Sequence, residues 1–402
     1  MKVGILLGRG IEGCGVTKMA IEQAKWYNKN GHEAVIIANR DKTWPRKKTH
    51  DFAEIEVYHE KFKDPKNTET IKKMVENLDL LYVDSVPSIK HPAEGIDLFR
   101  ELVTQKDTPI VFIQLDHNVM SIRRNACMIE AVENAKAIFA FGVKNDFVVF
   151  LEKKYAKEGK TFDREILTYA VPFPFDEARK TYWKDINEQD PKHHKWIGRC
   201  TSWKGQDVMF KFHDQFLQGG ECLTTLEGIE RGPAFLSFRE LYDYEDHTKN
   251  KEGIKSVDLT KYYGEKANVF SIFRQPEMLE RMSKVGFGYQ LSILKPRYIT
   301  TQVEYTHCEV VAAGAIPVFR KGWGDLAKHR VTGIPLSECK DTGTIWLDET
   351  NFEESYETIK KLESDPVMRN EWREKAFKFY KNHQDSDHIV KEMHSQITSR
   401  II

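Results

Sequence analysis

Residues 3–18 read VGILLGRGIEGCGVTK, an apolar run that passes directly into a glycine-rich segment. Such a strand, turn and helix start is typical of phosphate-binding sites, because the helix start offers free N–H groups to an anion. The dinucleotide pattern G-x-G-x-x-G is satisfied from Gly8 to Gly13. The NTPase pattern G-x-x-x-x-G-K-S/T fails where Val16 takes the place of lysine. A dinucleotide site, another phosphate site and a plain tight turn all stay open from this segment alone.

Short apolar runs alternate with helix-like stretches along the whole chain. Runs that are apolar throughout indicate strands buried on both faces, as in parallel sheets. In the first half they stand at 3–7, 34–38, 78–83, 109–113 and 137–141. In the second half they stand at 195–198, 234–238, 315–319 and 344–347. We therefore predict an α/β protein with two Rossmann-like, doubly wound domains facing a cleft.

The boundary between these domains is expected in the polar, proline-bearing stretch 172–191, interpreted as a linker. At 402 residues the chain is longer than one hydrophobic core normally supports. We predict an N-terminal domain over 1–180 and a C-terminal domain over 190–371. A C-terminal helix at 372–402 is expected to pack back on the N-terminal domain and complete it.

Composition excludes several classes of protein. The chain is 40% hydrophobic, and no apolar run approaches the roughly 20 residues of a membrane span. The first strand begins too early to leave room for a signal peptide. Six scattered cysteines fit reduced thiols in a cytoplasm. With 61 basic and 61 acidic side chains, the zero net charge counts against a constitutive nucleic-acid binder but not against an enzyme with one local basic patch.

Two cations follow a predicted strand in the second half. Arg199 and Lys204 stand between the run at 195–198 and a helix-like stretch. A guanidinium and an ammonium on such a loop can clamp a diphosphate. Because the helix dipole disfavours cations at a helix start, their position favours an anionic partner, with solvated charges as the alternative.

The segment EYTHCEVVAAGAIPV at 304–318 places two glutamates before a glycine and a proline that lead into a strand. It resembles the carboxylate segment of retaining nucleotide-sugar transferases of the two-domain GT-B type. There a glutamate at the helix start accepts hydrogen bonds from the nucleotide ribose, and Glu309 matches it by its spacing to Gly314. Glu304 lies five residues earlier, closer than is common, and a surface glutamate is the alternative.

Longer stretches make the likeness specific. The chain resembles the DNA α-glucosyltransferases of T-even bacteriophages over nearly its whole length. The stretches that carry the resemblance are GIEGCGVTK at 10–18, WIGR at 196–199, WKG at 203–205, ERMSK at 280–284, GFGYQLS at 286–292, EYTH at 304–307 and HQDS at 383–386.

This resemblance implies a GT-B fold and an enzyme that takes glucose from UDP-glucose. It would attach the sugar, with retained α configuration, to the hydroxymethyl group of 5-hydroxymethylcytosine in double-stranded DNA. DNA so modified resists host restriction, and the enzyme would act in the cytoplasm of the infected bacterium. The N-terminal domain would take the DNA acceptor and the C-terminal domain the UDP-sugar donor. We expect a monomer without a cofactor or an essential metal.

The resemblance also implies roles for individual residues. Arg199 and Lys204 would neutralise the UDP leaving group, Glu309 would hold the ribose, and Glu304 would touch the donor sugar or its phosphate environment. The expected donor-binding residues are Gly13, Cys14, Gly15, Leu115, Arg199, Lys204, Ser283 and Glu309, and the expected catalytic residues are Asp116 and Glu304.

Asp116 follows the strand run at 109–113 and corresponds to an aspartate of the family site. Near the anomeric centre, its carboxylate could accept the acceptor proton or stabilise oxocarbenium charge. A turn cap is the alternative role. Both a covalent intermediate and a front-face path are compatible with retention.

One position departs from the family pattern. Leu115 stands where the family has a histidine that, in related enzymes, hydrogen-bonds the 6-hydroxyl of the sugar. Leucine makes no such bond, and a buried hydroxyl without a partner costs about 1–3 kcal/mol. The hypothesis is a donor without that hydroxyl, UDP-arabinose. The alternative keeps glucose and lets another group, such as His117, take over the contact.

A DNA enzyme without net charge needs local basic patches. The candidates are Arg46, Lys47 and Lys48 beside Trp44, and Arg123 and Arg124 after the Asp116 loop. Solvated faces are the alternative for each. Reaching the hydroxymethyl group in a narrow cleft could require base flipping.

Two further motifs are expected to have no role in the site, and two other functions remain alternatives. The D-x-D motif at 385–387 is expected to follow a long helix and not to bind a metal, and His193-His194 is expected to be solvated in the linker. An NAD-dependent oxidoreductase remains an alternative through the first glycine loop. A transferase with a lipid, protein or small-sugar acceptor would share the UDP site but not the basic patches.

Overall fold

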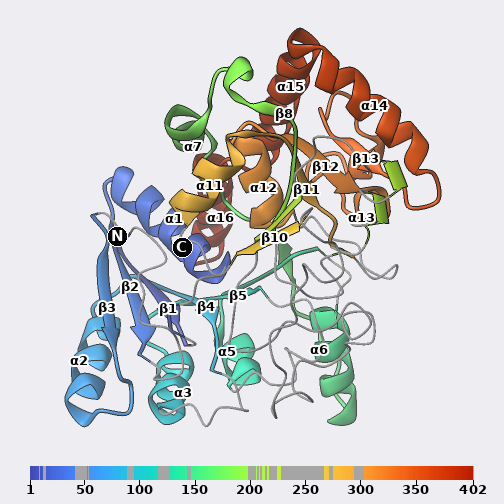
Figure 1. The fold of residues 1–402 in the computed structure, drawn as a ribbon. Helices are drawn as coiled ribbons and strands as arrows, with labels where there is room; N and C mark the ends of the chain where they lie inside the picture. Colours follow the sequence, from blue (N-terminus) through green and yellow to red (C-terminus); the bar gives the residue numbers. More distant parts are fainter. Residues whose placement is uncertain are drawn as a thin grey trace, which may run out of the picture. The chain divides into compact units, whose positions relative to one another are not determined.

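The computed structural model divides the chain into two compact units, each described here by itself (Figure 1). The N-terminal unit holds Met1–Pro174 and Gln384–Ile402, and the C-terminal unit holds Phe175–Pro296 and Val303–His383. The structure describes residues 1–8, 10–11, 15–40, 52, 54–87, 95–115, 127–142, 146–197, 205, 208, 211–212, 215–216, 224–227, 267–270, 275–293 and 303–401. The strand expected at 234–238 lies outside these residues.

The N-terminal unit contains a sheet of parallel strands in the order β3-β2-β1-β4-β5-β6-β7. Its strands are β1 (Lys2–Leu7), β2 (Glu33–Asn39), β3 (Glu56–Glu60), β4 (Leu80–Ser85), β5 (Ile110–Gln114), β6 (Ala137–Ala140) and β7 (Leu167–Thr168). Its helices are α1 (Gly15–Lys29), α2 (Pro65–Glu76), α3 (Ile96–Thr104), α5 (Met128–Asn134), α6 (Asp146–Lys157) and α16 (Ser386–Ile401). All five apolar runs predicted as strands in this half are confirmed, because residues buried on both faces leave no polar alternation.

The C-terminal helix α16 packs on α1 within this unit, as predicted, but residues 372–383 of the expected helix at 372–402 belong to the C-terminal unit. The Tyr27 hydroxyl lies 3.2 Å from His394 Nδ1, and Lys29 donates to Asp387 at 2.5 Å. Asp385 precedes α16, and its carboxylate accepts a hydrogen bond from the Asp387 N–H at 3.2 Å. The D-x-D motif therefore begins a helix and does not follow a strand.

The C-terminal unit contains a second parallel sheet, in the order β10-β9-β8-β11-β12-β13. Its strands are β8 (Asp190–Ile197), β9 (Thr224–Glu227), β10 (Ala267–Phe270), β11 (Val285–Gln290), β12 (Ile316–Arg320) and β13 (Ile345–Leu347). Its helices are α7 (Phe175–Tyr182), α11 (Gln275–Met282), α12 (Tyr305–Ala312), α13 (Lys321–Leu326), α14 (Phe352–Ser364) and α15 (Pro366–Gln384), with 3₁₀ turns at Ile186–Glu188 and Leu336–Glu338. The predicted fold class is confirmed.

The stretch 172–191, interpreted as the linker between the domains, contains the division between the two units after Pro174. It also holds α7, a 3₁₀ turn and the start of β8, and its polar residues take part in packing contacts. Trp183 donates its indole N–H to the Ala312 carbonyl at 2.8 Å, and the Arg179 guanidinium lies 4.0 Å from the centre of the Trp183 ring. Arg179 also forms two hydrogen bonds to Glu374, at 2.6 and 2.8 Å.

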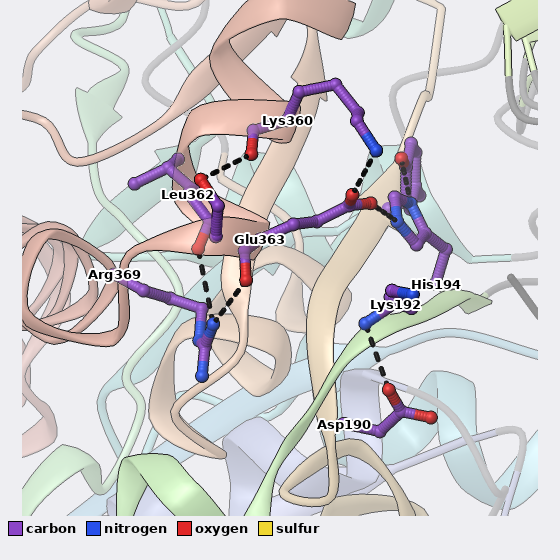
Figure 2. Close-up of polar contacts among 9 residues, drawn as sticks. Asp190, Lys192, His194, Lys360, Leu362, Glu363 and Arg369 are labelled. Atoms are coloured by element: carbon purple, nitrogen blue, oxygen red, sulfur yellow. Dashed lines mark hydrogen bonds and ion pairs between the residues drawn. The ribbon is translucent and has the colours of Figure 1, made fainter. Parts of the chain in front are cut away.

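His194 corrects a second expectation, because it is fully buried in β8 and not solvated. Its Nδ1 lies 2.5 Å from the Tyr289 hydroxyl and its Nε2 lies 3.3 Å from Glu363 Oε1. Lys360 donates to the other Glu363 oxygen at 3.1 Å (Figure 2). A neutral imidazole satisfies every partner if the tyrosine hydroxyl donates to Nδ1 and Nε2–H donates to the carboxylate.

This cluster predicts a loss of stability in mild acid. Burial lowers the pKa of His194, more than the hydrogen bond to Glu363 raises it. Below about pH 6.5 the unfolded chain therefore binds a proton that the folded chain rejects, and stability falls as the pH falls. The His194→Gln variant should lose about 1–3 kcal/mol at pH 7, because it disturbs buried partners.

Urea unfolding at pH 7 and pH 5 measures both effects. The wild type should lose more stability between these values than His194→Gln does. Equal losses in the two proteins would show that His194 does not contribute to the acid sensitivity.

In the described part of the chain, no helix is both long enough and apolar enough to cross a membrane.

Candidate functional site

In both sheets, the direction in which successive strands are added reverses beside the first strand of the unit. In the N-terminal unit the chain leaves β1 through β2 and β3 and returns to β4 on the other side of β1. In the C-terminal unit it leaves β8 through β9 and β10 and returns to β11 on the other side of β8. Open parallel sheets bind ligands at such switch points, outside the carboxyl ends of the strands. The two candidate sites therefore lie after β1 and β4 and after β8 and β11.

Glycines are required at the first switch point. The Gly8 N–H donates to the Ser85 carbonyl at 3.0 Å and joins the ends of β1 and β4. A Cβ on Gly8 would lie 2.9 Å from that same carbonyl oxygen. Gly10 has φ +80°, and a Cβ there would lie 2.4 Å from the Asn39 carbonyl. Helix α1 then begins at Gly15, so the loop brings backbone and a helix start to the place where an anion would bind.

Asp84 at the end of β4 is a residue that the sequence analysis missed. Its side chain is 1% exposed, and neither carboxylate oxygen has a hydrogen-bond partner within the described part of the chain. Tyr82, two residues earlier and so on the same face, bonds to the Tyr27 hydroxyl of α1 at 2.6 Å. Burial raises the pKa of Asp84 well above its ordinary value. The signal was visible as a charged residue inside the apolar run LLYVDS.

Replacement of Asp84 by asparagine is expected to raise the free energy of unfolding at pH values where an aspartate of the unfolded chain is ionised. The raised pKa keeps the native carboxyl protonated while the unfolded one ionises, so its stabilising contribution is present in acid and is lost as the pH rises. Asn keeps the shape and carries no charge. Urea unfolding should show Asp84→Asn gaining stability over the wild type from pH 5 to pH 8, and a constant difference would contradict this account.

At the second switch point, a glycine on β11 lets α12 approach the sheet. A Cβ on Gly288 would lie only 2.5 Å from Val310 Cγ1 of α12. This close packing brings Glu304, at the start of α12, to the end of β11. Glu304 Oε2 accepts hydrogen bonds from Ser292 Oγ at 3.2 Å and from Gln290 Nε2 at 3.5 Å.

Two expected donor-binding residues lie in the same unit. Ser283 follows α11, is fully buried, and donates its hydroxyl to the Glu280 carbonyl at 2.8 Å. Glu309 is fully buried but lies inside α12, whereas Glu304 occupies the N-cap position. The expected position of Glu309 at the helix start is therefore wrong, because Glu304 stands there and Glu309 lies one turn further along. Leu115 is half-buried and directly follows β5 in the N-terminal unit.

Most of the other expected residues lie outside the described part: Gly13, Cys14, Arg46, Lys47, Lys48, Asp116, Arg123, Arg124, Arg199 and Lys204. For three of them, described residues lie close by in the chain. Strand β8 ends at Ile197, just before Arg199, and β5 ends at Gln114, just before Asp116. Gly205 has φ +68°, and a Cβ there would lie 2.2 Å from the Leu291 carbonyl. The residue after Lys204 is therefore held against the end of β11.

Within the described ranges, no group of three or more His, Cys, Asp or Glu side chains is arranged to hold a metal ion. The expectation of a metal-independent reaction stays a prediction.

Comparison with known proteins decides between the function classes. A family model described as DNA alpha-glucosyltransferase matches residues 14–367. The chain belongs to this family. It is also 38% identical over 410 residues to the DNA alpha-glucosyltransferase of Enterobacteria phage T4, covering 99% of this chain and 100% of that protein. Membership makes the protein a UDP-sugar-dependent glycosyltransferase and sets the oxidoreductase alternative aside.

Solved structures of α-glucosyltransferase agree with this assignment. One is a complex with UDP and a 13-mer DNA containing an HMU base, with a TM-score of 0.87, 36% identity, and 99% of both chains covered. A second, with UDP-glucose and DNA containing an abasic site, has the same TM-score, identity and coverage. Anabaena HepE in complex with UDP and glucose is 15% identical, with a TM-score of 0.61 over 99% of this chain and 100% of HepE, which shows the fold alone.

Proposed function

We propose that this protein transfers a sugar from a UDP-sugar to the hydroxymethyl group of 5-hydroxymethylcytosine in double-stranded DNA, with retention of the α configuration. The observation that carries the proposal is full-length similarity to α-glucosyltransferases solved with UDP-glucose and with DNA. The C-terminal unit would bind the donor and the N-terminal unit the acceptor. The reaction would protect phage DNA from restriction in the cytoplasm of the infected cell.

The donor roles follow from the second switch point. Arg199 and Lys204 would neutralise the diphosphate as it leaves, because both follow β8 at the edge where ligands of such sheets bind. Glu309 would accept hydrogen bonds from the ribose. Glu304 would accept them from donor hydroxyls, since a carboxylate pairs poorly with a diphosphate anion but well with O–H donors. Ser283, also expected to bind the donor, instead precedes the start of β11 at the amino ends of the strands, where its carbonyl accepts a hydrogen bond from Gln189, so it lies away from this edge.

The acceptor roles belong to the loops after the strands of the N-terminal unit. Gly13, Cys14 and Gly15 would approach the donor from the glycine loop, and Asp116 would act on the acceptor hydroxyl or the developing positive charge. The basic residues proposed to contact DNA phosphates are Arg46, Lys47, Lys48, Arg123 and Arg124. No metal is proposed for any step.

Glucose is the proposed donor sugar, and arabinose is the alternative. The family's donor favours glucose. Leu115 favours a pentose, because it is a half-buried apolar residue directly after β5 where the sequence comparison expected a histidine. Leucine cannot satisfy a buried sugar hydroxyl, and the resulting discrimination is about 1–3 kcal/mol.

Nucleoside mass spectrometry of 5-hydroxymethylcytosine duplex tests both donors. With UDP-glucose we expect a hexose adduct. If the sugar is instead arabinose, UDP-arabinose should give a pentose adduct while UDP-glucose is inert, and Leu115→His should shift kcat/KM toward UDP-glucose by about tenfold, because it restores one hydrogen bond.

Two controls test the proposed acceptor independently of donor binding. Cytosine duplex without the hydroxymethyl group should gain no sugar. If neither donor modifies the hydroxymethylated duplex while UDP still raises the melting temperature of the protein, the proposed acceptor is wrong.

A further inference from the structure

Gln290 ends β11 in a fully buried position, and its side-chain amide links four groups. Its Oε1 accepts a hydrogen bond from the Ser292 N–H at 3.1 Å and lies 2.9 Å from Ser292 Oγ, whose single proton is shared between this oxygen and Glu304 Oε2 at 3.2 Å. Its Nε2 donates to Thr306 Oγ1 and, at 3.5 Å, to Glu304 Oε2. The amide therefore joins the end of β11 to the first turn of α12.

The backbone fixes which way this amide points. The Ser292 N–H can only donate, so it selects the amide oxygen and turns Nε2 toward Glu304. A flipped amide would place its oxygen against the carboxylate and its NH₂ against the backbone N–H. Gln290 is 0% and Ser292 1% exposed, so bulk water does not compete for these contacts. The arrangement holds two donors, the amide and the serine hydroxyl, against one carboxylate oxygen.

The side chain of Glu304 does not cap the helix at whose start it lies. It occupies the N-cap position of α12, but its side chain makes no capping hydrogen bond in that helix. Its backbone carbonyl accepts from the His307 N–H at 3.0 Å, which anchors the main chain. Gln290 and Ser292 contact the carboxylate across the β11–α12 contact that Gly288 permits.

We propose that Gln290 and Ser292 are positioning residues that orient the Glu304 carboxylate toward the sugar of the donor. The inference rests on the proposed donor role of Glu304. A carboxylate that selects among sugar hydroxyls must be held to a fraction of an ångström, because misplacement by about 1 Å costs up to 100-fold in rate. Neither residue needs to touch the donor, since both act through Glu304.

A double-mutant cycle in donor binding tests this without any DNA. Kd is measured by calorimetry for UDP-glucose, UDP-arabinose and UDP, in the wild type and in Gln290→Met, Ser292→Ala and Glu304→Ala. Gln290→Met and Ser292→Ala should each weaken the tighter-binding UDP-sugar by about five- to tenfold. UDP affinity should change less than about twofold, because UDP lacks the sugar. In the Glu304→Ala background both replacements should add less than about twofold.

Two further variants separate positioning from folding. Ser292→Thr keeps the hydroxyl and should restore sugar binding. Ser355→Ala removes another buried hydroxyl of the same unit, which donates to the Trp346 carbonyl at 3.4 Å, and should change neither affinity. Equal weakening of UDP and UDP-sugar, or additive effects in the Glu304→Ala background, would overturn the inference.

The transfer assay is scored separately from the cycle. A wild type that binds UDP-sugar with the expected coupling but leaves hydroxymethylated DNA unmodified supports the positioning role and counts against the proposed acceptor. A wild type that glucosylates DNA without coupling between Gln290 and Glu304 supports the function and removes the positioning role.

Discussion

The close approach of α12 to β11 is the constraint on which the candidate donor site depends. It exists because Gly288 has no side chain, and a Cβ there would lie 2.5 Å from Val310. The approach brings the start of α12, with Glu304, beside the end of β11, with Gln290. On the neighbouring loop, Gly205 lies against the Leu291 carbonyl in a backbone conformation that favours glycine. Both glycines thus leave room for a close contact, with the Val310 side chain at Gly288 and with the Leu291 carbonyl at Gly205.

The sequence predicts the fold well because parallel sheets leave a plain signal. Strands buried on both faces read as continuous apolar runs, and each of the runs in the first half became a strand of the N-terminal unit. Short or more polar strands carry no such signal: β3 (Glu56–Glu60) is partly exposed, and β7 is a two-residue strand. The helix α7 within 172–191 carries no such signal either, because polar residues such as Arg179 and Trp183 make its packing contacts.

The site was harder to predict than the fold. Glu304 and Ser283 were named from the family likeness, but nothing in the local sequence pairs Gln290 with Glu304, fourteen residues away. His194 was expected in solvent because its neighbours are polar, and its partners Tyr289 and Glu363 come from distant segments. A local sequence pattern indicates which residues are buried and whether their spacing suits a helix or a strand. Contacts between distant segments depend instead on which helices and strands the topology brings together.

The carboxyl groups at the two switch points have different surroundings, since Asp84 is buried and Glu304 is partly exposed. In β4, Asp84 has no hydrogen-bond partner among the described residues, and its burial raises its pKa, which favours the neutral carboxyl group. At β11, Glu304 receives a serine hydroxyl and an amide, donors that favour an anion. A neutral carboxyl group is less costly to bury in an apolar interior than a charged one. A carboxylate held in one orientation can accept hydrogen bonds from the O–H groups of a sugar. The polar strand end GYQLS therefore marks the donor edge more strongly than the glycine loop does, because the loop fits a tight turn equally well.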